Sequence, residues 1–390
     1  MNTVVTPTHP LDPRVLAAFT LLVFTTSGTI HLQTPLLGQF GAEFHASSSA
    51  VGWIPTLTFG GFFAGTVFLV PLGDRVDKRP LILAQMFALV VALLAMAFAT
   101  SLAMAVAASF AIGFFCGLSQ HSIPFASELA LPEERGRVVG TVLSGVFTGL
   151  LFARVVSGLI AQNWSWRWSY VVGAAIVAIA GVIAFFTVPS SSTRSRLSYI
   201  ELLRSVVQLF KQQPKIRHPS AVQFFTGLCY GGFWATMAAM LLATYGYGPA
   251  IAGLIGIPGA AGILVARYAG RWMDKSGIAP VVTLGVSTII VAELIFGLAA
   301  VSIAFVIIGV ALLDCGLRAT LVAKQTAVTH AAPDARSRAT TIFTAHMWGG
   351  NAVGAMIGSY AYAHWGWHAV CAIGVVAAVI ALSIARSTNR

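Results

Sequence analysis

The stretch Pro132-Glu-Glu-Arg-Gly-Arg137 has a second copy later in the chain, Pro333-Asp-Ala-Arg-Ser-Arg338. The loop Gly73-Asp74-Arg75 likewise matches Met273-Asp274-Lys275 at nearly the same offset. After the first pair the offset persists without a gap, so that small and aromatic residues coincide: Gly149 with Gly350, Ala153 with Gly354, Gly158 with Ser359 and Trp166 with Trp367. Several features in one register indicate that the chain consists of two parallel repeats.

The composition indicates that both repeats lie in a membrane. Of the 390 residues, 57% are hydrophobic and only 9% are charged, whereas soluble domains carry about 25% charged residues. The apolar residues also come in runs of about 20, the length that a helix needs to cross hydrocarbon. We therefore predict an all-α membrane protein with twelve transmembrane helices, six in each repeat. The helices are expected near 14–39, 51–71, 80–99, 103–127, 138–161, 168–188, 219–244, 249–269, 280–299, 302–327, 339–362 and 368–386.

The net charge of +11 follows the predicted topology. If the N-terminus is inside, nearly all of the 23 Lys and Arg residues fall in inner loops and only Arg167 in an outer one. Arg154, Arg318 and Lys324 fall within spans. This asymmetry is the positive-inside rule and predicts that both termini are cytoplasmic. The basicity therefore does not require nucleic-acid binding.

The longest polar stretch separates the two repeats. It predicts an N-terminal six-helix bundle over residues 1–188, a cytoplasmic linker over 189–218 and a C-terminal six-helix bundle over 219–390. Within the linker, apolar residues recur at helical spacing between Tyr199 and Phe210, which predicts an amphipathic helix on the inner membrane surface. The four cysteines lie within predicted spans without C-x-x-C spacing, so neither a metal site nor a cofactor is predicted.

The loop Leu72-Gly73-Asp74-Arg75-Val76-Asp77-Lys78-Arg79 resembles the G-x-L-a-D-R-x-G-R-K signature of the major facilitator superfamily. Val70 and Asp77 stand where that signature has glycines. The second copy, Gly270-Arg-Trp-Met-Asp274-Lys275-Ser-Gly277, keeps both glycines. Within the superfamily the chain looks most similar to bacterial exporters of the drug:proton antiporter-1 type. The resemblance implies a multi-pass protein of the bacterial cytoplasmic (inner) membrane that works as a monomer by alternating access.

The resemblance also implies gates made by these loops. Asp74 is expected to dock at the start of the 339–362 helix near Arg336 and Arg338. By repeat symmetry, Asp274 is expected to meet the start of the 138–161 helix near Arg135 and Arg137. A carboxylate at a helix N-terminus is stabilised by the free N–H groups there. Arg75, Arg79 and Lys275 complete the predicted gating residues; the alternative is that these are ordinary positive-inside loops.

Ionisable residues at membrane depth are the candidates for the transport site, because each is costly to bury. Arg154 either binds an anionic substrate group, controls the proton of a nearby carboxylate, or forms a salt bridge or carbonyl contact to another span. Asp314 and Arg318 are four residues apart on one helix and can pair; Asp314 is the candidate proton carrier. Glu293 is discounted because its span is peripheral in this fold. The remaining substrate-binding candidates are polar or aromatic residues of the spans predicted to line the cavity: His31, Gln33, Gln120, His121, Trp234 and His346.

Three functions remain open at this point. The first is proton-coupled export of a small organic molecule or drug, and the second is uptake or exchange of an organic anion. The third is an intramembrane enzyme, but the chain contains no H-E-x-x-H, G-x-S-x-G or nucleotide-binding loop. The expected partners are therefore a small-molecule substrate, protons and the lipid bilayer.

Overall fold

The computed structural model describes residues 10–73, 75–191 and 198–387, and these are almost entirely helical. Eleven helical segments are long and apolar enough to cross a membrane. One further long helix, α16, is as long as the others but more polar. The helices and short 3-10 turns are α1 (Pro13–Thr29), η1 (Thr34–Leu36), α2 (Leu37–Glu43), α3 (Ser48–Val51), α4 (Trp53–Gly73), α5 (Lys78–Ala97), α6 (Leu102–Cys116), α7 (Ser119–Glu128), α8 (Arg135–Asn163), α9 (Trp166–Thr187), α10 (Tyr199–Gln212), α11 (Pro214–Tyr245), α12 (Pro249–Leu254), η2 (Ile257–Ala260), α13 (Ala261–Ser276), α14 (Ile278–Phe296), α15 (Ile303–Ala331), η3 (Pro333–Ala335), α16 (Arg336–Trp365) and α17 (Trp367–Ser387).

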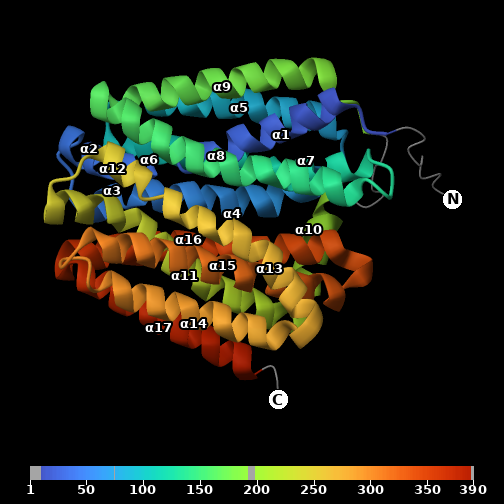
Figure 1. Ribbon diagram of the computed structural model, residues 1–390. Helices are drawn as coiled ribbons and strands as arrows, with labels where there is room; N and C mark the ends of the chain where they lie inside the picture. Colours follow the sequence, from blue (N-terminus) through green and yellow to red (C-terminus); the bar gives the residue numbers. More distant parts are fainter. Residues whose placement is uncertain (1–9, 74, 192–197, 388–390) are drawn as a thin grey trace.

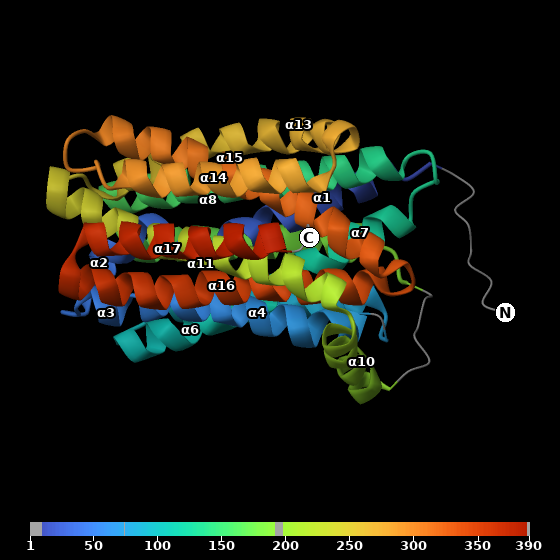
Figure 2. The same ribbon diagram turned by 90° about the horizontal axis from the view of Figure 1, so that it is seen from below.

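The long helices run side by side, and the start of α1 and α10 lie at one end of the bundle (Figure 1). The opposite end carries α2 and α3, as the view from below also shows (Figure 2). We call these the α10 end and the α3 end. The buried apolar residues form two large clusters, one built almost wholly from α1 to α9 and the other from α11 to α17. The two halves of the chain therefore each surround their own core.

Three of the predicted spans are interrupted rather than continuous. The first is α1 followed by η1 and α2, with a break around His31. Pro35 explains this break, because its ring clashes with the carbonyl four residues earlier and its nitrogen donates no hydrogen bond. Pro258 acts in the same way after α12, while Gly117 ends α6. The interruptions matter because they place His31 and Gln120 beside irregular backbone in the middle of the bundle.

The linker helix α10 contacts both halves at its end of the bundle. Its first turn is closed by a capping box between Ser198 and Glu201. The Tyr199 hydroxyl donates to the carbonyl oxygen of Phe68 in α4 over 2.8 Å. At the other end of the helix, the Phe210 ring lies 4.9 Å from the His346 ring of α16. Both apolar contacts and hydrogen bonds thus hold α10 against the two halves.

The halves meet most closely at the α3 end. A Cβ atom on Gly158 of α8 would lie 2.3 Å from the carbonyl oxygen of Pro249, and one on Gly52 would lie 2.2 Å from Cβ of Ser359. Real Cβ contacts are never this short, so only glycine permits these backbone approaches. These contacts join the backbones of the two halves at the α3 end.

Candidate functional site

A cavity of about 240 Å³ lies between the two halves, on the α10 side of these close contacts. Its polar lining comes from α7, α11, α15 and α16 and from the break after α1. Aromatic residues from both halves, including Phe62, Phe147 and Trp348, form much of the remaining wall. A concave, largely apolar pocket with a few polar groups is the usual form of a small-molecule site. This cavity is therefore the candidate transport site.

One ion pair lies in the cavity wall. Asp314 and Arg318 both project from α15, and Arg318 Nη2 lies 3.8 Å from Asp314 Oδ1. The Arg318 guanidinium also lies 4.8 Å from the centre of the Phe147 ring in the other half. The second carboxylate oxygen, Oδ2, is buried and has no hydrogen-bond partner among the described residues. The two charged groups are therefore too far apart for a hydrogen bond, and each can still bind a ligand group or an ion.

Arg154 lies behind the cavity wall and does not line it. Its side chain is 1% exposed, and its Nη2 donates to the Tyr230 hydroxyl over 2.5 Å. The same nitrogen lies 3.2 Å from His31 Nδ1. Because a guanidinium only donates, Nδ1 must accept, which places the proton of the neutral imidazole on Nε2. His31 and Tyr230 both line the cavity, so Arg154 acts on it through them.

Four buried polar atoms around the cavity have no hydrogen-bond partner among the described residues. Besides Asp314 Oδ2, they are Gln223 Oε1, Trp348 Nε1 and Asn351 Oδ1. Buried polar groups are normally satisfied, and leaving one unpaired costs about 1–3 kcal/mol. These residues therefore bring three acceptors and one donor without a described protein partner to the lining of one cavity. The cavity can bind a molecule that combines an aromatic or apolar body with polar groups.

The structure brings some of the predicted site residues together and separates others. His31, Gln120, Asp314 and Arg318 line the cavity. Gln33 instead accepts a hydrogen bond from Thr58 and donates to the Ile30 carbonyl. Trp234 stacks on Arg154, and His346 packs on α10. His121 lines a different cavity near the α10 end.

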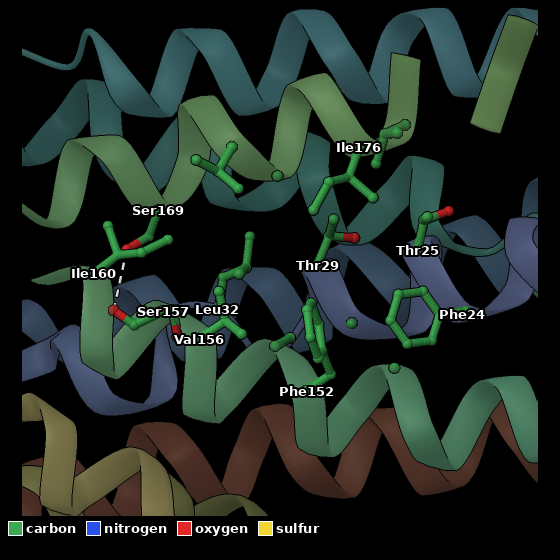
Figure 3. Close-up of a pocket in the computed structure, with 16 residues that line it drawn as sticks. Phe24, Thr25, Thr29, Leu32, Phe152, Val156, Ser157, Ile160, Ser169 and Ile176 are labelled. Atoms are coloured by element: carbon green, nitrogen blue, oxygen red, sulfur yellow. Dashed lines mark hydrogen bonds between the residues drawn. The ribbon is translucent and has the colours of Figure 1, made fainter. Parts of the chain in front are cut away.

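Sequence reasoning did not propose Tyr230, Gln223 or Asn351. They are uncharged residues of long apolar helices, and nothing in their spacing distinguishes them from packing residues. Only the hydrogen bond from Arg154 identifies Tyr230, and only unpaired buried atoms identify Gln223 and Asn351. Figure 3 shows a smaller hollow between α1, α8 and α9, where Ser169 donates to the Ser157 carbonyl. Its volume of about 40 Å³ leaves room for only a few water molecules.

The predicted gating residues lie at the α10 end. Asp74 is outside the described residues. Arg79 donates to the Phe185 carbonyl over 2.6 Å, and Arg137 pairs with Glu134 over 2.7 Å. Within the parts of the chain that the structure describes, no ion pair includes Asp274 or Lys275, which are exposed at the end of α13. Arg75, Arg135 and Arg336 are exposed and Arg338 is partly buried, so the predicted latches stay predictions.

Comparison with known protein families and sequences identifies transporters. The model of the Major Facilitator Superfamily matches residues 18–322 and 220–388. The uncharacterized transporter YgaY of Escherichia coli O157:H7 is 32% identical over 379 residues, covering 97% of this chain and 96% of its own.

Two solved structures share the fold at low sequence identity. A bacterial homologue of the human lysosomal transporter Spinster, in an inward-facing and unoccupied conformation, has a TM-score of 0.75 at 16% identity and covers 97% of this chain and 98% of its own. The nucleoside transporter NupG has a TM-score of 0.78 at 13% identity, with 96% and 98% covered. The chain is therefore a multi-pass membrane transporter and not an enzyme, and it belongs to the Major Facilitator Superfamily.

Proposed function

We propose that this transporter carries a small organic anion across the bacterial inner membrane by alternating access, and that Asp314 couples this movement to protons. The observation that carries the proposal is the balance of charge around the cavity. Two guanidinium groups, those of Arg154 and Arg318, stand against one carboxyl group, that of Asp314. An anionic substrate would restore neutrality, and charges buried at membrane depth are stabilised by such pairing.

Arg318 is the residue that contacts the substrate. Its side chain is 20% exposed into the cavity and its only described ion-pair partner is Asp314, 3.8 Å away. A carboxylate or similar group would accept two parallel hydrogen bonds from Arg318. Such a bidentate pair is stronger than the present contact between Arg318 and Asp314. Arg154 supports the anion indirectly, because it holds the Tyr230 hydroxyl and the His31 ring at the cavity wall.

Proton coupling follows from competition for Arg318. When a substrate anion takes Arg318, the Asp314 carboxylate loses its partner in a buried site, and protonation then removes an unpaired charge. Anion and proton would therefore bind together and move in the same direction. The two bodies that move are residues 1–188 and 219–390, and the present state, with its cavity on the α10 side, faces the cytoplasm if both termini are cytoplasmic.

A second candidate is proton-coupled export of an uncharged or cationic drug. The unpaired Asp314 Oδ2 favours it, since Asp314 lines a cavity with several aromatic walls. A lipophilic cation would compete with the proton for Asp314, so that substrate and proton would move in opposite directions. The two candidates therefore differ in the sign of proton movement.

The test uses purified protein in proteoliposomes that contain a pH-sensitive dye. Benzoate and related anions are added on one side, and tetraphenylphosphonium is added in a parallel series. Acidification of the lumen together with anion entry, lost in Arg318→Gln, supports the organic-anion proposal. Luminal alkalinisation on entry of tetraphenylphosphonium, unchanged in Arg318→Gln, would favour the drug exporter instead.

A further inference from the structure

A second cavity, of about 320 Å³, lies at the α10 end between α4, α5 and α7 of the first half and α16 of the second. Gln120 lines both this cavity and the central one, so it stands between them. We call the second cavity the vestibule. Its lining residues are Thr66, Val70, Lys78, Gln120, His121, Pro124, Glu128, Arg336, Ser337, Thr340 and Thr341.

The vestibule has more positive than negative charge. The Lys78 side chain is 7% exposed, and its Nζ lies 2.5 Å from Glu128 Oε2 and 5.1 Å from the centre of the Phe125 ring. This pair is neutral overall. Arg336, in the first turn of α16, belongs to no ion pair among the described residues. Its charge is therefore available to an anion in the vestibule.

The start of α16 adds hydrogen-bond donors. This helix has 30 residues, and its N-cap position is Ala335, which has no side chain that could accept from the first-turn N–H groups. Ser337 and Thr340 place hydroxyl groups on the same wall, whereas the hydroxyl of Thr341 already donates to the Ser337 carbonyl over 3.0 Å. Uncapped N–H groups at a helix N-terminus attract anions.

An independent observation on the opposite wall points to a ligand. His121 of α7 is 4% exposed and lines the vestibule, yet neither ring nitrogen has a hydrogen-bond partner among the described residues. A neutral imidazole always carries one N–H donor and one acceptor. Burying both without a partner is costly, and a ligand in the vestibule would remove that cost for the donor.

We propose that the vestibule is a second binding site, which takes the carboxylate or phosphate group of an anion. Arg336, the first turn of α16 and the Thr340 hydroxyl bind the oxyanion from one half, and His121 donates to it from the other. The identity of the ligand as the transported organic anion rests on the proposed function; the oxyanion chemistry does not. The two sites lie in series, with Gln120 between them.

The experiment measures equilibrium binding of radiolabelled benzoate to the full-length protein in detergent. Two classes of site are expected. Thr340→Val and His121→Leu should each weaken one class by about tenfold or more, the loss typical of a hydrogen bond to a charged group. His121→Gln, which keeps a donor, should retain it, and Arg318→Gln should remove only the other class. Monodisperse elution on gel filtration identifies the variants that fold. If His121→Leu does not fold, Thr340→Val, at the cavity wall, still tests the site.

The competitors determine the chemistry of the site. Inorganic phosphate should displace benzoate from the class that depends on Thr340, whereas uncharged benzamide should not. Displacement by benzamide, or equal binding in wild type, Thr340→Val and His121→Leu, overturns the vestibule site. A single class lost only in Arg318→Gln overturns it while the proposed function stands. A single class lost in Thr340→Val but not in Arg318→Gln leaves the vestibule site and overturns the proposed function.

Discussion

The guanidinium of Arg154 lies against the indole ring of Trp234, with Cζ 3.6 Å from the ring centroid. Arg154 belongs to α8 in the first half and Trp234 to α11 in the second. The same guanidinium donates to Tyr230, one helical turn away from Trp234. Since both partners are buried, one side chain joins the halves beside the cavity without an acidic partner among the described residues.

Arg154→Ala should reduce transport by about tenfold or more while the protein still folds. The substitution removes a cation–π contact and a charged hydrogen bond, each worth about 1–3 kcal/mol, but it leaves no carboxylate unpaired. Arg154→Lys should also fail, because an ammonium cannot stack on the indole while bonding to Tyr230 and His31. Transport in proteoliposomes measures the loss of activity, and the melting temperature in detergent shows whether the variants still fold. Full activity in Arg154→Ala would remove this residue from the transport machinery.

Asp314→Asn should uncouple transport from protons. The amide is close in size to the carboxyl group but cannot exchange a proton, so exchange of substrate across the membrane should continue while accumulation driven by a pH gradient is lost. Glu293→Gln is the matched control, since Glu293 is a buried carboxyl group packed against Gly374 and away from the cavity. Proton-driven accumulation that survives in Asp314→Asn would show that another group carries the proton.

Gly158→Ala should open the α3 end. The new Cβ would lie 2.3 Å from the Pro249 carbonyl oxygen. Overpacking of this kind costs about 1–3 kcal/mol. The population of the state with this contact should therefore fall at least about fivefold relative to the state without it. Gly140→Ala on the same helix is the control, because nothing lies within 4 Å of its Cβ position. The measurement is labelling by a membrane-impermeant maleimide of Ser359→Cys, a buried position that faces Gly52 at the α3 end, in a background without the native cysteines. Equal labelling rates in both alanine variants would contradict the prediction.

Asp77→Asn should lower stability at neutral pH by about 0.3–1 kcal/mol, the usual contribution of a negative charge at a helix N-terminus, because asparagine can still cap the helix. Burial by itself would raise the pKa of Asp77. Hydrogen bonds from the backbone N–H groups of Ser191 and Arg79, at 2.9 and 3.0 Å, outweigh it and hold the pKa below the usual 3.8. The stabilisation is therefore present above pH 3.8 and is lost as the pH falls through the lowered pKa.

The melting temperatures of wild type and Asp77→Asn should consequently differ at pH 7 and converge in acid below pH 3.8. Asp12→Asn removes the charge from an exposed helix cap that bonds only within its own first turn, and it should have a smaller effect. A difference between wild type and Asp77→Asn that does not shrink in acid would assign the loss to packing.

Asp74→Ala should slow turnover more than it weakens substrate binding. The predicted latch belongs to the opposite conformation, so its loss changes the rate of interconversion and not the contacts in the cavity. Asp334→Ala, an exposed acid beside the start of α16, is the control. Turnover is measured by exchange in proteoliposomes and binding by the ligand-induced shift in melting temperature. Unchanged turnover would show that Asp74 is an ordinary loop residue.

The fold could be predicted from the sequence because membrane helices need about 20 apolar residues and because the repeat pairs such residues as Trp166 and Trp367. The cavity could be predicted only where a charge marks it, as at Asp314 and Arg318. Tyr230 and Asn351 could not be found, because their roles depend on which face of a helix meets the other half. Arg154 was identified as buried, but the sequence does not show that Tyr230 and His31 separate it from the cavity.

The polarity of α16 has a consequence for how the protein is made. Unlike the eleven apolar segments, this helix carries too many polar residues, including His346 and Asn351, to enter hydrocarbon readily by itself. It packs along α11, where Gly350 and Gly354 come against the backbone of Phe224 and Leu228. Insertion of α16 into the membrane must therefore depend on helices synthesised before it. Bulky substitutions at Gly350 or Gly354 would separate α16 from α11, so we expect them to lower the amount of protein found in the membrane as well as its transport activity.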